Sequence, residues 1–429
     1  MIGVIADDFS GATDVAVAFS RKGLRTLLYF GVPNDTVFPA LHDAVVVALK
    51  SRMAPVGEAV SDSLSAMDWL RRHGSDRFYF KYCSTFDSTN QGNSGPVLDA
   101  LSDALGGPTV VTTPSSPEHG RTQYMGYLFV EDTILADSHM AHHPLTPMTD
   151  SSVSRLLSRQ TRKQVELITL AVVRQGTEAI RSAVADATSR GSRYVLVDAV
   201  EPGDLDNVGL AVVDHPMVAG AAGLARALAA ATVRSATSIV GDTGQENIKH
   251  TPDGNAAVLA GSCSDRTLHQ IDVLVDAGHP TFYLDPTDEP EPVRLAATAL
   301  RWFDKASSVH GGLAPGFYSS ARQDELERVQ KALGARRSAA ILEETMGRIA
   351  VGLVGRGVKR LVAAGGETCG AIVSALGVTS GFVGHEVAPG VPWILVSQRE
   401  LALLLKSGNF GPTTLFVDAT AEPTVESAP

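Results

Sequence analysis

The sequence contains few cysteines. Cys83, Cys263 and Cys369 are the only three, and they lie far apart along the chain. No CxxC or CxxH spacing occurs among them, which argues against a structural zinc site. A small, odd number of cysteines is typical of a reducing compartment, so we expect a cytoplasmic protein.

Long apolar runs are also missing. A strand-like segment begins at Ile2 with no charged and apolar leader before it, and no later run is long enough to cross a bilayer. We therefore expect no signal peptide and no membrane partner.

An excess of positive charge is missing as well. The 36 lysines and arginines are outnumbered by 47 aspartates and glutamates, and the formal net charge is -11. Nucleic-acid binders normally carry a basic surface, so this balance argues against a nucleic-acid partner. It leaves room for a local basic pocket that binds an anionic metabolite.

The length and composition indicate two globular domains. The chain has 429 residues, of which 44% are hydrophobic and 19% charged. Turn-forming residues gather between Thr237 and Gly254, and a new strand-like segment starts at Ala256. We predict an N-terminal domain over residues 1–235, a linker over 236–254 and a C-terminal domain over 255–429.

Short apolar segments alternate with longer amphipathic ones. This alternation predicts an α/β fold of two domains with mostly parallel sheets, and an active site in the cleft between them. The predicted strands are Ile2–Ala6, Leu27–Phe30, Val45–Leu49, Phe78–Tyr82, Thr109–Thr112, Val165–Val173, Tyr194–Val197, Ala256–Leu259, Thr281–Leu284, Gly316–Ser319, Arg360–Ala364 and Trp393–Val396. The predicted helices include Ala12–Lys22, Val60–His73, Ala179–Arg190, Ser264–Ala277 and Gln323–Arg356.

Polar side chains follow four of the N-terminal strands. In open parallel sheets, ligands bind beyond the carboxyl ends of the strands, so these side chains are candidates for a binding site. Carboxylates and hydroxyls can bond to the hydroxyl groups of a small polyhydroxylated acid, and cations can pair with its carboxylate. The candidates are Asp7, Asp8, Ser51, Arg52, Lys81, Ser84, Thr85, His119 and Arg121.

Asp7 and Asp8 have two interpretations. An aspartate directly after a strand often caps the next helix, but one cap needs only one side chain. We therefore expect at least one of the pair to be functional, as a general base for an attacking hydroxyl. Arg52 and Arg121 could be ordinary surface cations, although their places after predicted strands favour ligand contact, and a lone loop histidine such as His119 is usually just exposed.

Three loops of the C-terminal domain are rich in glycine and hydroxyl side chains, two after predicted strands and the third after the apolar segment Leu401–Leu405. They are Gly261–Ser264, Gly365–Thr368 before the helical segment Ala371–Leu376, and Lys406–Gly411. Glycines let backbone N–H groups approach a phosphate, and a helix N-terminus adds a favourable dipole. The spacing matches neither the Walker A motif nor the dinucleotide fingerprint, but three such loops in one domain favour a nucleotide polyphosphate.

Taken together, these segments resemble the four-carbon acid sugar kinase family, and within it the branch of 3-oxo-tetronate 4-kinases. The resemblance is carried by Gly3–Asp14, Ala48–Arg52, Phe80–Thr89, Gly120–Thr122, Gly126–Phe129 and the three glycine loops, in order over nearly the whole chain. The run Lys81–Ser88 favours this branch over the threonate and erythronate kinases.

The resemblance implies transfer of the γ-phosphoryl group of ATP to the O4 hydroxyl of 3-oxo-tetronate in carbohydrate-acid catabolism. It implies ATP contacts at Ser262, Ser264, Gly365, Gly366, Glu367, Thr368 and Gly408, and sugar-acid contacts at Asp7, Asp8, Ser51, Arg52, Lys81, Ser84, Thr85 and Arg121. The working hypothesis makes Asp8 or Asp7 the base, with Arg121 and Lys81 on the substrate's oxygens. Mg²⁺ would bridge the phosphates, and its protein ligands stay unknown.

Alternatives stay open at this point. A D-threonate or D-erythronate kinase would have the same three glycine loops, so these loops do not separate it from a 3-oxo-tetronate kinase. A non-catalytic sugar-acid sensor would need no ATP-binding loops, so their presence argues against it. A phosphatase with an aspartate nucleophile usually shows Asp-x-Asp spacing, which Asp7 and Asp8 lack. The sequence departs from the family pattern at Gly220–Gly223, at Cys369 and at Pro117–His119, and the last of these makes the substrate less secure than the reaction class. A homodimer also stays open, because no interface can be located from the sequence.

Overall fold

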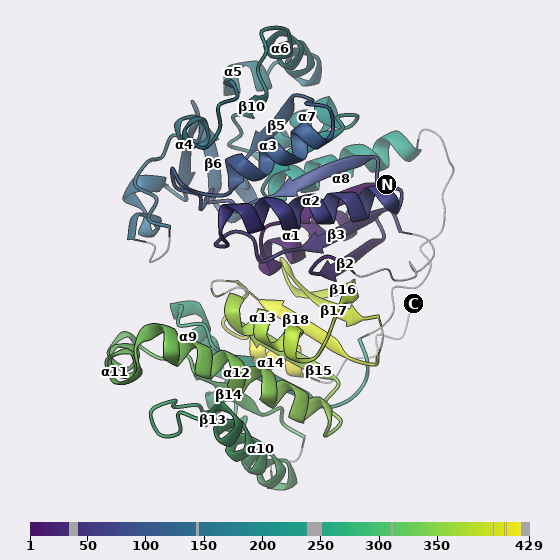
Figure 1. Ribbon diagram of the computed structural model, residues 1–429. Helices are drawn as coiled ribbons and strands as arrows, with labels where there is room; N and C mark the ends of the chain where they lie inside the picture. Colours follow the sequence, from purple (N-terminus) through teal and green to yellow (C-terminus); the bar gives the residue numbers. More distant parts are fainter. Residues whose placement is uncertain are drawn as a thin grey trace. The chain divides into compact units, whose positions relative to one another are not determined.

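The computed structural model describes residues 1–33, 42–142, 146–237, 251–309, 312–397, 399–406, 408 and 410–421. The chain divides into two compact units, Met1–Gly244 and Gln245–Pro429 (Figure 1). The helix before the predicted linker runs to Thr237, and most of the linker lies outside the described residues. No helix in the described part of the chain is both long enough and apolar enough to cross a membrane.

The described part of the N-terminal unit is built on eight parallel strands. Parallel strands are covered on both faces, which explains why these segments are apolar throughout rather than alternating. Their order across the sheet is β2 (Thr26–Phe30), β3 (Ala44–Ala48), β1 (Ile2–Ala6), β4 (Arg77–Lys81), β11 (Met217–Gly220), β5 (Val110–Thr113), β10 (Tyr194–Val197) and β9 (Val165–Ile168).

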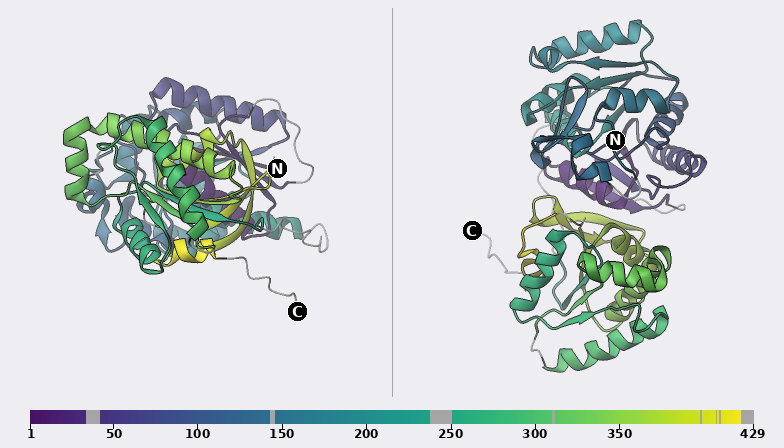
Figure 2. Two further views of the ribbon diagram at one scale, coloured as in Figure 1. Left: turned by 90° about the horizontal axis from the view of Figure 1, so that it is seen from below. Right: turned by 90° about the vertical axis from the view of Figure 1, so that its left-hand side faces the viewer.

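Helices cover both faces of this sheet. Connections that lead toward β2 and those that lead toward β9 must lie on opposite faces, because crossovers between parallel strands are right-handed. One layer contains α1 (Phe9–Ser20), α6 (Thr177–Ser189), α7 (Pro202–Val212) and α8 (Ala222–Thr237), packed in the order α1, α8, α7, α6; the other contains α2 (Val56–Arg72), α3 (Ser94–Ala104) and α4 (Val153–Gln160). Figure 2 shows these layers from two further sides.

A small antiparallel sheet is attached to the N-terminal unit. It consists of β6 (Arg121–Tyr124), β7 (Tyr127–Val130) and β8 (Thr133–Ile134). Three short 3₁₀ turns flank it, at Pro117–His119, Leu135–Asp137 and His139–His142.

The C-terminal unit has a mixed sheet of seven strands. Five are parallel, in the order β13 (Thr281–Tyr283), β14 (Gly316–Tyr318), β12 (Ala256–Ala260), β15 (Arg360–Ala364) and β18 (Ala402–Lys406), and β17 (Val391–Val396) and β16 (Ser380–Ala388) continue it antiparallel. α9 (Asp265–Asp276) packs with α14 (Leu415–Thr420), while α10 (Pro292–Val309), α12 (Ala335–Val354) and α13 (Gly366–Ala375) form a second group, with α11 (Gln323–Leu333) against α12.

The predicted fold class is confirmed, with local corrections. The segment predicted as a strand over Val165–Val173 ends at Ile168, and a short helix, α5 (Leu170–Val173), follows because the buried Asp198 carboxylate accepts the Leu170 N–H at 3.2 Å. The helix predicted over Gln323–Arg356 is two helices that divide at Gly334, whose φ of 82° breaks the helical path. The predicted strands did not include the small sheet, β11, β16 or β18. The strands of the small sheet, β11 and β18 have only two to five residues, and glycine, histidine and glutamate interrupt the apolar pattern of β16.

Candidate active site

The polar loops of the N-terminal unit meet at one edge of its sheet. In the strand register, Ala6 at the end of β1 pairs with both Ala48 and Lys81, the last residues of β3 and β4. Gly220 at the end of β11 lies between Lys81 and Thr113. The carboxyl ends of β1, β3, β4 and β5 are therefore level, with the end of β11 inserted among them.

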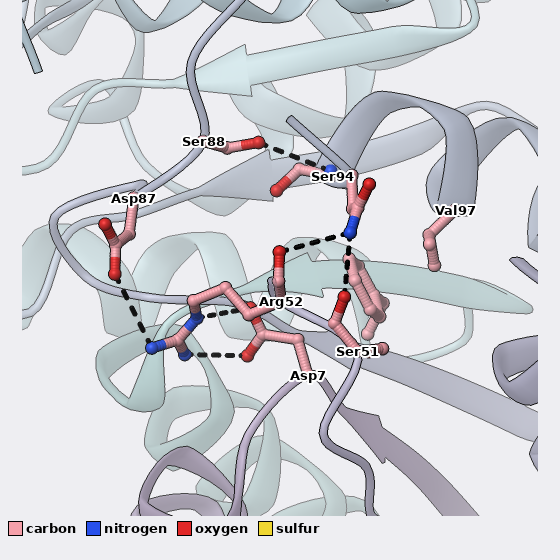
Figure 3. Close-up of a pocket in the computed structure, with 9 residues that line it drawn as sticks. Asp7, Ser51, Arg52, Asp87, Ser88, Ser94 and Val97 are labelled. Atoms are coloured by element: carbon pink, nitrogen blue, oxygen red, sulfur yellow. Dashed lines mark hydrogen bonds and ion pairs between the residues drawn. The ribbon is translucent and has the colours of Figure 1, made fainter. Parts of the chain in front are cut away.

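Arg52 is the centre of an ion network at this edge. Its Nε and Nη2 donate to the two oxygens of Asp7, each at 2.8 Å, and Nη2 also donates to Asp8 Oδ1 at 2.6 Å. Nη1 lies 3.7 Å from Asp87 Oδ2 (Figure 3). The Arg52 side chain is only 18% exposed, so its charge is compensated mainly by these carboxylates. Arg52 therefore organises the acidic loops, and its hydrogen bonds already go to protein groups.

Asp8 caps the helix that follows it, which is the first of the two interpretations of the aspartate pair. It is the N-cap of α1, and its Oδ1 accepts the Gly11 N–H at 3.0 Å. Burial alone would raise the pKa of Asp8, but the charges of Arg52 and Lys81 and the Gly11 amide together lower it. Burial raises the pKa of the neighbouring Asp7 against the attraction of Arg52, and the charge of Asp8 adds to the rise.

Asp87 joins the network through an unusual loop. Phe86 and Asp87 both have positive φ, at 62° and 46°, which is uncommon for residues with a side chain. This turn directs the Asp87 carboxylate toward Arg52, and the Thr146 hydroxyl donates a short hydrogen bond to it. The loop conformation thus places a third carboxylate beside Arg52, and the sequence analysis did not include Asp87 among the site residues.

Lys81 is buried beside the first turn of α1. Its side chain is 3% exposed, and it makes no hydrogen bond or ion pair with the described residues. A Cβ built on Gly11 would lie 2.5 Å from Lys81 Nζ and 2.4 Å from Asp8 Oδ1. Glycine is therefore required at position 11 for the ammonium group and the carboxylate to approach the helix this closely.

Ser51 borders a small cavity behind Arg52. The cavity is lined by Asp7, Ser51, Arg52, Phe80, Asp87, Ser88, Asn93, Ser94 and Val97 (Figure 3). Its free space is about 10 Å³, roughly what one water molecule needs and far too little for a four-carbon acid. Asn93 Nδ2 holds this loop by donating to the backbone oxygens of Ser51 and Ala54, each at 2.8 Å.

Two further predicted contacts come from the loop after β4. Thr85 is buried, and its hydroxyl lies 3.1 Å from Cys83 Sγ. Ser84 is half-buried in the turn beside it.

Arg121 begins β6, directly after Gly120, whose φ is 68°. Its Nη1 donates to the His119 carbonyl oxygen, and its Nε is buried without a hydrogen-bond partner among the described residues. Burial lowers the pKa of His119, and the cations Arg121 and Lys81 add to this effect. A guanidinium with a buried unpaired N–H suits an anionic or carbonyl ligand.

The three glycine loops of the C-terminal unit also converge. β12, β15 and β18 are adjacent, and the Gly261 N–H donates to Ala364 O at 2.9 Å while the Gly365 N–H donates to Lys406 O at 3.0 Å. A Cβ built on Gly261 would lie 2.2 Å from Thr368 Oγ1, and one built on Gly408 would lie 2.6 Å from Ser262 Oγ, so both positions require glycine for the loops to pack this closely. Ser407 and Asn409 of the third loop lie outside the described residues.

Ser264 links two of these loops. It is the N-cap of α9, accepting the Thr267 N–H at 3.3 Å, and its hydroxyl donates to Gly408 O at 2.7 Å. Ser262 Oγ donates to Ser264 Oγ at 3.2 Å. The Ser262 and Ser264 hydroxyls are thus ordered around Gly408.

The N-terminus of α13 has the form of a phosphate site. Its N-cap is Gly365, with φ of 115° and no side chain to cap the first turn. Gly366 and Glu367 are exposed, and a Cβ on Gly366 would meet nothing within 4 Å. The helix therefore begins without a side-chain cap at an exposed glycine whose Cβ position is open among the described residues, which suits the phosphates of ATP.

Lys406 lies buried beneath the same loops. Its Nζ donates to Thr267 Oγ1, Gln270 Oε1 and Gly408 O, at 2.8, 2.7 and 2.8 Å, and the residue is 1% exposed. Its three donors are thus satisfied by neutral groups. Burial lowers the pKa of Lys406 from 10.5 to about 8.

This burial predicts a specific pH dependence of stability. Between about pH 8 and 10.5 the unfolded chain holds the Lys406 proton more firmly than the folded one, so folding gains free energy as pH rises through this window. Across this window the free energy of unfolding of the wild-type C-terminal unit should rise by up to about 3 kcal/mol relative to that of the Lys406→Met variant. Urea unfolding of both proteins from pH 7.5 to 10 measures this, and a constant difference would contradict it.

Within the described ranges, no group of three or more histidine, cysteine, aspartate or glutamate side chains is arranged to hold a metal ion. Asp7, Asp8 and Asp87 are instead directed at Arg52.

The chain matches two family models, one in each unit. The model of a sugar-binding N-terminal domain covers residues 2–228, and that of a nucleotide-binding C-terminal domain covers residues 257–416. The chain belongs to the four-carbon acid sugar kinase family.

Relatives within the family are similar over nearly their whole length. The 3-oxo-tetronate kinase of Pseudomonas fluorescens is 42% identical over 424 residues, covering 98% of this kinase and 97% of the relative. That of Haemophilus influenzae is 38% identical over 416 residues, covering 97% and 98%. A solved structure from Salmonella typhimurium LT2 has a TM-score of 0.87 at 38% identity, covering 97% and 98% of the two chains. These similarities support an ATP-dependent phosphotransferase that acts on an alcohol group of a sugar acid.

Besides Asp87, two charged residues near the predicted sites were not among the predicted contacts. Asp14 lies on α1 near Lys81, and Lys406 supports the phosphate loops. A charged residue within an otherwise apolar, buried segment such as Leu401–Lys406 was the available signal for Lys406. Asp14 gave no comparable signal, because an aspartate in the first turns of a helix is common.

Proposed function

We propose that this kinase transfers the γ-phosphoryl group of ATP to the O4 hydroxyl of 3-oxo-tetronate, forming 3-oxo-tetronate 4-phosphate. The observation that carries the proposal is the pairing of two sites of opposite character. The N-terminal unit offers cations and carboxylates at one sheet edge, and the C-terminal unit offers an open helix N-terminus among glycine loops. The named substrate of relatives at 38–43% identity supports 3-oxo-tetronate as the acceptor.

In the proposed acceptor site, the cations hold the substrate. Lys81 Nζ and the unpaired Arg121 Nε would bind the carboxylate and the oxo oxygen of the sugar acid, with Ser84 and Thr85 beside them. Asp8 would orient the acceptor hydroxyl. Asp7 has both oxygens on Arg52, which makes it a positioning residue for Asp8 and Arg52.

In the proposed nucleotide site, backbone groups hold the phosphates. The N–H groups of Gly366, Glu367 and Thr368 would bind phosphate oxygens, and the hydroxyls of Ser262 and Ser264 border Gly408 beside them. Phosphoryl transfer needs mainly positioning and charge neutralisation, which these groups provide. Mg²⁺ would take its ligands mostly from phosphate oxygens and water, and would neutralise part of the phosphate charge.

The proposal includes the compartment in which the enzyme works and its partners. An ATP-dependent enzyme with three free thiols would work in the cytoplasm, with small molecules as partners. A homodimer stays a prediction that oligomeric-state measurements would test.

A coupled ADP-release assay tests the substrate. Mg-ATP would be offered with 3-oxo-tetronate, D-threonate, L-threonate and D-erythronate, and we expect turnover with the 3-oxo acid alone. Turnover with D-threonate, L-threonate or D-erythronate would support the kinase activity but would contradict 3-oxo-tetronate as the sole acceptor. Binding of the acids without turnover of any of them would contradict the proposed kinase reaction and favour a non-catalytic sensor. Trapping of an acyl-phosphate on Asp7 or Asp8 would favour a phosphatase.

A further inference from the structure

Four carboxylates lie near Arg52 and Lys81, and three of them already have partners. Asp7 uses both oxygens on Arg52, and Asp8 accepts from Arg52 and from the Gly11 N–H. Asp87 is held by Arg52 and by the Thr146 hydroxyl. Each of these three carboxylates thus has at least one oxygen held by Arg52 or another fixed donor, and such donors favour the charged carboxylate and oppose uptake of a proton from a substrate.

Asp14 is the fourth carboxylate, and its surroundings differ. It lies on α1 three residues after Gly11, and therefore on the same face of the helix. Helical side chains lean back toward the N-terminus, which carries the Asp14 side chain toward the bare backbone of Gly11, where Lys81 Nζ lies. Among the described residues Asp14 has no hydrogen bond and no ion pair, and it is only partly exposed.

We propose that Asp14 is the catalytic base of this kinase, and that its carboxylate accepts the proton of the acceptor hydroxyl. The proposal rests on the proposed function. Gly11 makes it feasible, since any side chain there would meet Lys81 Nζ and Asp8 Oδ1 and displace the ammonium group from the first turn of the helix that carries Asp14.

The step balances without any further reactant. The hydroxyl O–H bond breaks, the proton moves to a carboxylate oxygen of Asp14, and the oxygen's electron pair forms a bond to the γ-phosphorus. The bond between that phosphorus and the β–γ bridging oxygen breaks, and its electron pair stays with ADP. Asp14 then returns its proton to water.

The charges around Asp14 suit this role. Burial raises its pKa to about 6, Lys81 and Arg52 oppose the rise, and Asp8 adds to it. The elements packed on α1 carry few other charges: β1, β2 and β3 have none, β4 has Arg77 at its opposite end, and α8 has Arg226 and Arg234. A base with a pKa somewhat below neutrality is ionised at pH 7 and still takes up a proton readily.

The test compares Asp14→Asn with Asp8→Asn across pH, after the wild type has been shown to phosphorylate an acid of the panel. In the wild type we expect kcat to fall below an apparent pKa near 6. Asp14→Asn should lower kcat about 100-fold to 10,000-fold, leave the KM for ATP unchanged and remove this acidic limb. Asp8→Asn keeps a capping side chain and should lower kcat while the acidic limb remains.

The possible outcomes separate the two proposals. No turnover by the wild type on any acid would overturn the proposed function. With an active wild type, Asp14→Asn with near-normal kcat and an intact acidic limb would overturn the base assignment alone, and loss of the limb in Asp8→Asn only would transfer the role to Asp8. If Asp14→Asn does not fold, Asp14→Glu is the test variant. A reduced kcat whose pH profile keeps the acidic limb supports the assignment of Asp14 as the base, and a wild-type kcat contradicts it.

Discussion

Replacing Arg52 by methionine should destabilise the N-terminal unit by about 3–5 kcal/mol, the range measured when one member of a buried ion network is removed. The methionine fills similar space but leaves Asp7, Asp8 and Asp87 as neighbouring, partly buried carboxylates without their shared cation. Their mutual repulsion and their lost solvation both oppose folding.

The pH dependence of the loss identifies its cause. Without Arg52, burial should raise the folded-state pKa values of these aspartates above those of the unfolded chain. Protonation then favours the folded state, so the difference from the wild type should shrink as pH falls from 7 to 5. Hydrogen exchange of peptides from β1 and β3 measures the stability of this unit by itself.

Arg25→Met is a matched control. Arg25 makes a similar two-pronged contact with Asp43, with Nε and Nη2 at 3.0 and 3.1 Å from the two oxygens, but its side chain is 52% exposed. An exposed pair of this kind contributes about 1 kcal/mol or less. Equal losses in the two variants, or a loss in Arg52→Met that does not depend on pH, would mean that Arg52 does not hold the acidic loops together.

Much of the fold could be predicted from the sequence because its strands are apolar on both sides. Segments such as Ile2–Ala6 and Arg360–Ala364 are fully buried in parallel sheets, and their boundaries were predicted at the observed residues. Short strands that depend on their neighbours for definition, such as β11, carry no such signal. Its position between β4 and β5 is fixed by long-range pairing, which local patterns do not encode.

The candidate site was predictable at the level of loops rather than of individual roles. The ends of parallel strands identify which segments meet, so Asp7, Asp8, Arg52 and Lys81 could be grouped from the sequence alone. Which carboxylate pairs with which cation depends on the three-dimensional path of each loop. The positive φ values of Phe86 and Asp87, and the close contact of Lys81 with Gly11, are properties of tertiary structure.

Replacing Gly366 by valine should weaken ATP binding without weakening the fold. Gly366 is the first residue of α13, it is exposed, and a Cβ there would meet no atom of the described residues within 4 Å. If the phosphates of ATP lie against the helix N-terminus, the valine side chain occupies their place and displaces them from the N–H groups. A charge-assisted hydrogen bond contributes about 1.5–3 kcal/mol, so the KM for ATP should rise about 10-fold to 100-fold.

Two comparison variants separate this effect from a general effect of replacing glycine. Gly203→Val makes the same change in the first turn of α7, where a Cβ also meets nothing within 4 Å, and should alter neither the KM for ATP nor the Tm. Gly365→Ala changes a residue with φ of 115°, so it should lower both the Tm and ATP binding. A KM for ATP within twofold of the wild type in Gly366→Val, confirmed by calorimetric titration with ADP, would place the phosphates away from α13 and leave the loops around Gly408 as the nucleotide site.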